Sequence, residues 1–284
     1  MGSPPLTRYN LLMARTKNGR RIAFLSGVVV VAAVTGFVWV SWDEIRAWYL
    51  FWREFESLGV NAQGYPEYRH HKSGIVFVWL PGGEFYMGSP EASSETDEGP
   101  IHKVTLSAFL VAKYEVTHAE WKKVAGNNPS GFKGDALSVH VSWEDCLAFC
   151  EKLGFSLPTE AQWEYACRAG TTGPFAGTAK LDDMGWYIDN SEERPHPVGE
   201  KRPNDFGLYD MHGNVWEWCE DVYDENFYSK PEARKRNPLC TSGSEKRVTR
   251  GGSTYSSREG CRSAYRRRGV HNIYVGFRPA WSWP

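Results

Sequence analysis

The amino-acid sequence predicts an α+β fold with little regular secondary structure, placed after an N-terminal transmembrane helix. An uncharged, apolar run over residues 22–42 predicts the transmembrane helix. Composition predicts the loop-rich fold, because 28 Gly, 16 Pro and 13 Trp are typical of a chain with many turns and a core filled by large aromatic side chains. Short candidate strands and short capped helices also follow one another without the regular alternation of an α/β fold.

Length and charge limit the interpretation. The 284 residues suffice for one large domain and an appendage. A formal net charge of −1 gives no overall field favouring nucleic acid or acidic substrates, so we expect no nucleic-acid partner. The predicted parts are a basic cytoplasmic tail over 1–21, a transmembrane signal anchor over 22–42, a juxtamembrane helix and linker over 43–74, and a globular domain over 75–284.

The N-terminal segments have the features of a signal anchor. A helix over 22–42, rising about 1.5 Å per residue, would cross a hydrocarbon core of about 30 Å. The run is longer than the apolar region of a cleaved signal peptide, roughly 7–15 residues. Trp39 and Trp42 lie where an interfacial aromatic belt is expected. Basic residues precede the run at Arg8, Arg15, Lys17, Arg20 and Arg21. They predict a cytoplasmic N-terminus and a globular domain outside the cytoplasm.

The chain after the anchor changes from helix to strand patterns. An aromatic-rich stretch over 43–55 predicts a short helix near the membrane surface, and 59–72 a linker. The apolar, β-branched run over 75–80 predicts a largely buried strand. Further strands are expected around 85–87 and over 104–111.

Three short helices are predicted by their ends. Each begins at a Ser or Thr followed three residues later by a Glu, Gln or Asp that completes or approaches a capping box: Thr117 with Glu120, Ser142 with Asp145, and Thr159 with Gln162. Gly126, Gly154 and Gly170 are placed to end them in a left-handed cap. Cys146 and Cys150 are one turn apart and so share a face. The chain has six cysteines but no CxxC pair, and its histidines are scattered, so a zinc site is not expected.

The stretch 207–218, GLYDMHGNVWEW, is too polar for a strand and too rich in glycine for a helix. Gly207 and Gly213 permit sharp turns. Asp210 and Glu217 carry hard oxygen ligands, and a turn between them can direct main-chain carbonyls inward, which suits Ca²⁺. In the alternative interpretation, Asp210 caps a turn, Glu217 pairs with an arginine, and the tryptophans belong to the core.

This stretch also resembles the signature of the formylglycine-generating enzyme (sulfatase-modifying factor) family. Other motifs of the family match in order: PGGEFYMGS at 81–89, KYEVTHAEW at 113–121, VSWEDCLAFC at 141–150, LPTEAQWEYACRAG at 157–170, RVTRGGS at 247–253 and GFRPA at 276–280. The resemblance implies the formylglycine-generating-enzyme variant of the C-type lectin fold.

The resemblance implies an oxidoreductase that uses O₂ to convert a protein cysteine to formylglycine, as in sulfatase maturation. In this family two cysteines hold Cu(I), a soft ion that prefers thiolates. Their positions fall on Ser256 and Cys261, so the copper pair lacks one of its two thiolates. Ser253 and Trp216 match family positions beside the oxygen pocket.

A calcium site is also implied by the resemblance. The family's second calcium site uses side chains at positions matching Asp210 and Glu217, and main-chain oxygens at Gly213 and Val215. We therefore expect Ca²⁺ at these four residues. The family's other calcium site has no counterpart in 186–205.

The family's disulfides are not preserved. The position that would pair with Cys150 is Pro279, and the position that would pair with Cys167 is Arg266. A Cys167–Cys261 bridge is one alternative for Cys261. The sequence does not fix the pairing of the six cysteines.

Three functions remain open, and family precedent favours the first. The first is a formylglycine-generating oxidase acting on a cysteine in a protein or peptide. The second is a non-catalytic binding module of the cell envelope, whose surface around 262–274 recognises a protein or glycan. Arg and Tyr are typical of interface hot spots, although a solvated basic loop is equally compatible; the contributing residues are Arg262, Tyr265, Arg266, Arg267, Arg268 and Tyr274. The third is a nonheme-iron oxidoreductase, since relatives of the domain work beside nonheme iron, but no two-His-one-carboxylate spacing supports it.

Overall fold

The computed structural model describes residues 23–25, 28–33, 36–41, 49–90, 96–127, 134–177, 180–269 and 275–283. The chain divides into two compact units, one formed by 1–55 with Pro284 and one formed by Glu56–Trp283. The second unit contains every motif discussed above from residue 81 onward.

In the first unit, the described residues of 22–42 form strands where the sequence predicts a helix. These are β1 (Ala23–Leu25), β2 (Val28–Ala33) and β3 (Gly36–Ser41), paired antiparallel in the order β1-β2-β3. The run is rich in valine and aromatic residues, which favour extended backbone. None of the helices in the part of the chain that the structure describes is long and apolar enough to cross a membrane. The helix predicted over 43–55 is present over 49–54.

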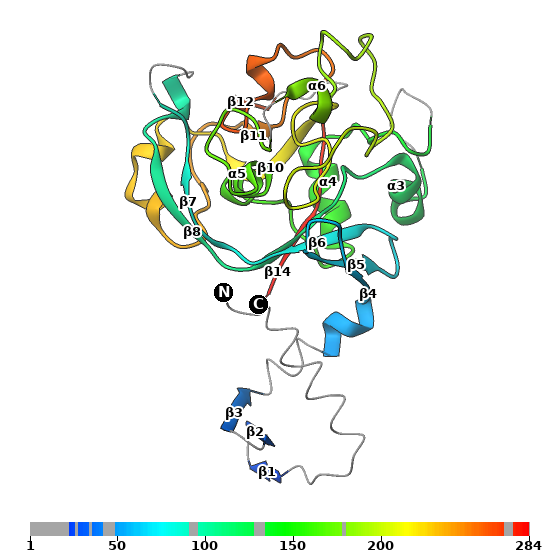
Figure 1. Cartoon of the computed structure of the whole chain (residues 1–284), viewed down its shortest axis with the longest axis vertical. Coiled ribbons are helices and arrows are strands. Elements are labelled where there is room, and N and C mark those ends of the chain that lie inside the picture. Colours follow the sequence, from blue (N-terminus) through cyan, green and yellow to red (C-terminus); the bar gives the residue numbers. More distant parts are fainter. Residues whose placement is uncertain are drawn as a thin grey trace. The chain divides into compact units, whose positions relative to one another are not determined.

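The largest sheet of the second unit joins the two ends of the domain (Figure 1). Its order is β14-β9-β6-β5-β4, from β4 (Phe55–Val60), β5 (Pro66–His70), β6 (Val76–Leu80), β9 (Phe109–Ala112) and β14 (Ala280–Ser282). The central strands are buried, as the apolar run over 75–80 predicts. Two differences from the sequence interpretation concern strands: β4 and β5 use residues assigned to the linker, and the single strand expected over 104–111 is two strands.

Two smaller sheets complete the second unit. A ribbon pairs β7 (Gly83–Met87) with β8 (His102–Leu106). A four-stranded sheet has the order β12-β11-β10-β13, from β10 (Trp216–Val222), β11 (Arg247–Arg250), β12 (Arg266–Arg268) and β13 (Val275–Gly276). The 207–218 stretch therefore runs from a turn directly into the central strand of this sheet.

The three predicted helices begin where the sequence places them. They are α3 (His118–Ala125), α4 (Trp143–Glu151) and α5 (Glu160–Arg168). The short α6 (Leu181–Met184) was not predicted. Reciprocal capping boxes form at Thr117 and Thr159, while at Ser142 the side chain accepts from the backbone N–H of Asp145. Gly126 ends α3 in a left-handed conformation as expected. The other two expected glycines do not cap their helices, because α4 ends at Lys152 in a right-handed conformation, before Gly154, and α5 ends at Ala169, one residue before Gly170. Single-turn 3₁₀ helices span Thr96–Glu98, Phe227–Ser229, Pro231–Arg234 and Glu259–Cys261.

Helix α5 lies in the middle of the core. All nine of its residues are buried, and Trp163, Ala166 and Cys167 pack in the main cluster with residues of β6, β7, β8, β9 and β10. Its charged side chains are consequently buried as well. The fold must neutralise them internally, because an unpaired buried charge costs several kcal/mol, about 3–5.

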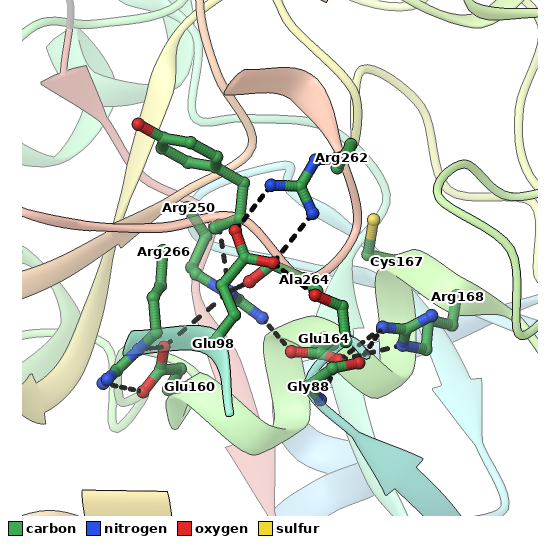
Figure 2. Close-up of polar contacts among 12 residues, drawn as sticks. Gly88, Glu98, Glu160, Glu164, Cys167, Arg168, Arg250, Arg262, Ala264 and Arg266 are labelled. Atoms are coloured by element: carbon green, nitrogen blue, oxygen red, sulfur yellow. Dashed lines mark hydrogen bonds and ion pairs between the residues drawn. The ribbon is translucent and has the colours of Figure 1, made fainter. Parts of the chain in front are cut away.

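That neutralisation is achieved by a network of arginines and glutamates around α5 (Figure 2). The Arg266 guanidinium donates two hydrogen bonds of 2.8 Å to the Glu160 carboxylate. Arg168 donates to Glu164 at 2.8 Å, and Arg250 donates to the other oxygen of Glu164. Arg250 also donates to the carbonyl of Ala264 at 2.6 Å. The network ties α5 to β11 and β12.

Candidate functional site

Four residues of the turn over 207–215 have positive φ. Gly207, Asp210, Gly213 and Asn214 have φ values of 85°, 60°, 146° and 65°. A Cβ atom on Gly213 would lie 2.1 Å from the carbonyl oxygen of Trp186, so only glycine fits there. This close approach places the turn against the segment that begins at Trp186.

Asp210 carries a buried oxygen that is not satisfied. One carboxylate oxygen accepts from the backbone N–H of Gly199 at 2.7 Å. The other, Oδ1, accepts no hydrogen bond from any residue in the described ranges, although the side chain is 1% exposed. Burial raises the pKa of Asp210 to about 6, and the Glu217 carboxylate adds to this rise. A cation beside Oδ1 would remove both penalties.

Glu217 is engaged by an arginine, as the alternative interpretation of the stretch expects. Arg278 Nε donates to Glu217 Oε2 at 2.7 Å, and Arg278 Nη2 donates to Oε1 at 2.6 Å. The indole N–H of Trp163 also donates to Oε2, at 2.7 Å. The structure therefore directs both oxygens of Glu217 into the core, and Asp210 is the side chain with an oxygen to offer.

Glu115 is a third buried carboxylate that the sequence interpretation missed. The side-chain N–H₂ of Asn214 donates to its two oxygens at 3.3 and 3.2 Å. Burial, together with the carboxylates of Asp210 and Glu217, holds the pKa of Glu115 well above its usual range. Three carboxylates thus share the charge of Arg278. The sequence signal for it was a glutamate between Tyr114 and Val116 in the motif at 113–121.

Of the four residues predicted to hold a cation, which are Asp210, Gly213, Val215 and Glu217, Asp210 has a buried side-chain oxygen without a hydrogen bond. Within the described ranges, no group of three or more His, Cys, Asp or Glu side chains is arranged to hold a metal ion. The orphaned Oδ1 of Asp210 and the excess of buried negative charge are the two observations that favour one. Side-chain oxygens and main-chain carbonyls in a flexible turn are suitable ligands for Ca²⁺.

Ser253 and Ser256 lie together at the expected copper position. The hydroxyl of Ser256 accepts from the backbone N–H of Ser253 at 2.9 Å and lies 3.3 Å from the Ser253 hydroxyl. Ser256 is half-buried. Two residues with exposed side chains are its neighbours: Tyr255 precedes it in the chain, and the backbone N–H of Ile188 donates to the Ser256 carbonyl at 3.1 Å.

Cys261 is the one thiol at this position, and it is fully buried. It packs with Phe175, Leu181 and Tyr187. Burial raises the pKa of the thiol to about 12, and the neighbouring Cys167 adds to the rise. A two-thiolate Cu(I) centre requires two ionised sulfurs. One buried neutral thiol and one hydroxyl do not fit that requirement.

His212 separates Cys167 from the backbone of Cys261. Cys167 Sγ lies 3.7 Å from His212 Nε2. The histidine donates from Nδ1 to the Cys261 carbonyl at 2.9 Å, and Nε2 accepts from the N–H of Ala176 at 3.0 Å. Burial lowers the pKa of His212 to about 4, so the ring is neutral. The alternative Cys167–Cys261 bridge is not formed, and all six cysteines are free and buried.

The predicted contact face over 262–274 is smaller than the sequence suggests. Arg262 is paired with Glu98 through two hydrogen bonds of 2.7 Å, and Arg266 is buried on Glu160. Arg267 and Arg268 remain exposed, with the Arg267 guanidinium 5.5 Å from the ring centre of Trp216. Tyr274 lies outside the described residues. The partners of the buried arginines are more than a hundred positions away, so no local pattern could reveal them.

Comparisons with known proteins agree with the motif resemblance. The sulfatase-modifying factor enzyme 1-like domain family matches residues 63–283. A chaperone protein LppX of Paenibacillus barcinonensis is 31% identical over 240 residues, which cover 63% of this chain and 79% of that protein. A formylglycine-generating enzyme of Streptomyces coelicolor is 32% identical over 245 residues, covering 62% of this chain and 77% of that enzyme. Treponema denticola variable protein 1 has a TM-score of 0.67 and 28% identity, covering 77% of this chain and 99% of that chain.

Proposed function

Because this chain belongs to the sulfatase-modifying factor enzyme 1-like family, we propose that its domain recognises a protein or peptide segment at the surface around Ser256 and does so without copper. The observation that carries this proposal is the set of donor atoms that Ser256 and Cys261 offer to a metal ion. Ser256 offers a hydroxyl already bound by Ser253, and Cys261 offers a thiol that is buried and has a raised pKa. The rim of this position nevertheless presents Ile188 and Tyr255, which are 45% and 38% exposed. Apolar and aromatic side chains of this kind are common anchors of protein interfaces.

A second candidate is the activity of the formylglycine-generating relatives, the oxidation of a protein cysteine. The free thiol of Cys261 and the relatives at about 30% identity favour it. This activity would need a source of soft ligands other than Ser256. Copper would supply activation of O₂ when bound, while Ser253 and Trp216 would border the space beside it.

One experiment separates the two candidates. Full-length protein in detergent is mixed with a cysteine-containing peptide in the presence of Cu(I) and O₂, and both binding and oxidation of the peptide are measured. Binding without oxidation, weakened by Tyr255→Ala, supports the binding module. Oxidation that is lost in Cys261→Ala establishes the oxidase instead. If the protein neither binds nor oxidises any peptide taken from envelope proteins, both candidates are contradicted.

We further propose that the turn over 207–215 binds one Ca²⁺ that stabilises the fold. Asp210 would hold it through Oδ1, with the main-chain oxygens of Gly213 and Val215, and Glu217 would contribute its charge while paired with Arg278. The orphaned oxygen and the raised pKa of Asp210 support this. A cation at a hundred times its dissociation constant stabilises the folded state by about 2.7 kcal/mol.

The charge pattern of the N-terminal residues supports a proposal about location. We propose that residues 22–42 anchor the chain in a membrane with the N-terminus in the cytoplasm and the second unit outside it. Protease added to intact spheroplasts should digest the second unit, whereas a cytoplasmic control protein stays intact. Protection of the second unit until the membrane is lysed would contradict this orientation.

A further inference from the structure

Residues 134–138 form a short strap between helix α3 and the segment 197–198. On one side, the first two residues of α3 donate backbone hydrogen bonds of 2.9 and 3.1 Å to carbonyls of the strap. On the other side, the backbone N–H of Val198 donates to the carbonyl of Ala136 at 3.0 Å. Residues 134–136 are exposed. A segment with exposed backbone that is held by local hydrogen bonds opens at a lower free energy than the core.

Two buried histidines flank the strap. His118 is the first residue of α3 and is 2% exposed, and neither nitrogen of its ring has a hydrogen-bond partner among the residues that the structure describes. The backbone carbonyls of Gly134 and Ser138, at the two ends of the strap, lie beside this ring. His140 follows the strap by two residues and is 8% exposed. The two imidazole rings are close enough for His118 to disfavour a charge on His140.

The surroundings of both rings disfavour the imidazolium form. Burial lowers the pKa of His118. Burial also lowers the pKa of His140 to about 4, and the neighbouring His118 adds to this fall. His118 lies in addition at the N-terminus of α3, where the helix dipole opposes a positive charge. Both imidazoles are therefore neutral at pH 7.5.

The carboxylates near the two rings do not compensate for burial. Asp135 on the strap raises the pKa of His118, as do the two strap carbonyls, but burial has the larger effect. On α3 itself, the Glu120 carboxylate accepts from the backbone and the hydroxyl of its own N-cap residue. Glu115, on the segment that pairs with the chain after the strap, accepts instead from Asn214. Protonation of either histidine therefore leaves a poorly compensated buried charge.

The charged groups on the other side of the strap respond to acid in the opposite direction. Arg194, His196 and Glu200 adjoin the strap there. Arg194 is paired with Glu192 at 3.0 Å. His196 Nδ1 lies 3.6 Å from a Glu200 oxygen, a contact that protonation of His196 would strengthen. Acid should consequently tighten that side, so a release of the strap in acid must come from His118 and His140.

We propose that His118 and His140 make the strap pH-sensitive, so that it is closed on α3 at neutral pH and is released when the two rings are protonated. An imidazolium requires water or hydrogen-bond acceptors around both ring nitrogens, which the closed strap does not supply. Opening supplies them, and proton uptake is thereby linked to opening. The released strap loses its backbone hydrogen bonds to α3 and to 197–198 together.

The direction and size of the effect follow from His140. Its pKa of about 4 in the closed state lies below the ordinary histidine value of about 6.5, so between these two values the open strap binds more protons than the closed one. Opening consequently becomes easier as the pH falls from about 6.5 to about 4. With an ordinary pKa in the open state, His140 alone raises the opening equilibrium about thirtyfold between pH 7.5 and pH 5. His118 acts in the same direction.

Amide hydrogen exchange of full-length protein in detergent, followed by mass spectrometry, measures this opening. Peptides that cover 134–138 are compared at pH 7.5 and pH 5 after correction for the intrinsic pH dependence of exchange, with peptides from β6 as the reference. A chelator is present throughout, so the turn over 207–215 is free of cation at both pH values. Relative to β6, opening of the strap should rise at least about tenfold on acidification.

Four variants assign the effect to the two rings. His140→Gln should lose most of the response, and His118→Gln combined with His140→Gln should lose it entirely. His196→Gln and the exposed His71→Gln should both keep the wild-type response. Thermal melts at pH 7.5 confirm that each variant is folded. A rise of less than about tenfold in wild type would overturn the proposal, as would a full wild-type response in His140→Gln or the loss of the response in His196→Gln.

Discussion

Replacing Arg266 with alanine removes the main partner of a carboxylate that is almost entirely buried. Glu160 is 1% exposed and receives two hydrogen bonds of 2.8 Å from the Arg266 guanidinium. Removing one member of a buried ion pair costs about 3–5 kcal/mol of unfolding free energy. Arg250 Nη1 remains 3.8 Å from Glu160 and offsets part of that loss. We therefore expect the lower end of the range, about 3 kcal/mol.

The expected fall in melting temperature follows from the size of the second unit. For domains of roughly 150–250 residues, 1 kcal/mol corresponds to about 2–4 °C, so Arg266→Ala should melt about 6–12 °C below wild type. The matched control is Arg268→Ala on the same strand, which is exposed and should change stability by less than about 0.5 kcal/mol. Calorimetry or circular dichroism of the two variants, beside wild type, measures both values.

A double variant tests whether the loss comes from the unpaired charge. Glu160→Gln with Arg266→Met replaces the pair by a neutral polar and an apolar side chain, and should recover most of the stability that Arg266→Ala loses. The reasoning is refuted if Arg266→Ala melts within about 2 °C of wild type, close to the Arg268→Ala control. It is also refuted if the double variant is less stable than Arg266→Ala alone.

Three further predictions use simpler measurements. A chelator should lower the melting temperature of wild type at pH 7.5 but not that of Asp210→Ala, and an identical melt with and without chelator argues against the cation. With chelator present, the raised pKa of Asp210 means that the contribution of this carboxyl group to stability is lost as the pH rises from about 4 to about 6. Ca²⁺ affinity should fall below about pH 6, because the proton competes for the same carboxylate, and an affinity independent of pH between 5 and 7.5 would exclude Asp210 as a ligand. Ser256→Cys should raise Cu(I) affinity sharply in a competition titration, with Cys261→Ala as control; no gain would exclude this position from copper binding.

The local features of the fold could be predicted because their causes are close together in the chain. The capping residues Thr117, Ser142 and Thr159 act within three positions, and all three helices begin after them. The buried strand over 76–80 follows from its own apolar run. The division of 104–111 into β8 and β9 was missed, because both halves carry strand-forming residues and the break lies at Ser107-Ala108.

The site was harder to predict because its partners are distant in sequence. Glu217 could bind a cation or an arginine, and the choice depends on Arg278, which lies 61 positions away. Glu115, the third carboxylate of the cluster, lies 99 positions from its hydrogen-bond partner Asn214. The contact face predicted over 262–274 is smaller for the same reason, because Arg262 pairs with Glu98 and Arg266 pairs with Glu160. Charge and residue type identified the positions, but only the tertiary contacts show which partner each one takes.

The six unpaired cysteines affect both the expression of the protein and its irreversible loss after unfolding. No cross-link holds the fold, so the second unit should form in the reducing cytoplasm of an expression host and melt identically with and without reductant. Outside the cytoplasm, where thiols oxidise, any molecule that unfolds exposes six sulfurs that can join in non-native pairs. Such a molecule does not refold to the native state. At the location proposed above, the working lifetime of the domain would then be set by its rate of unfolding rather than by its equilibrium stability.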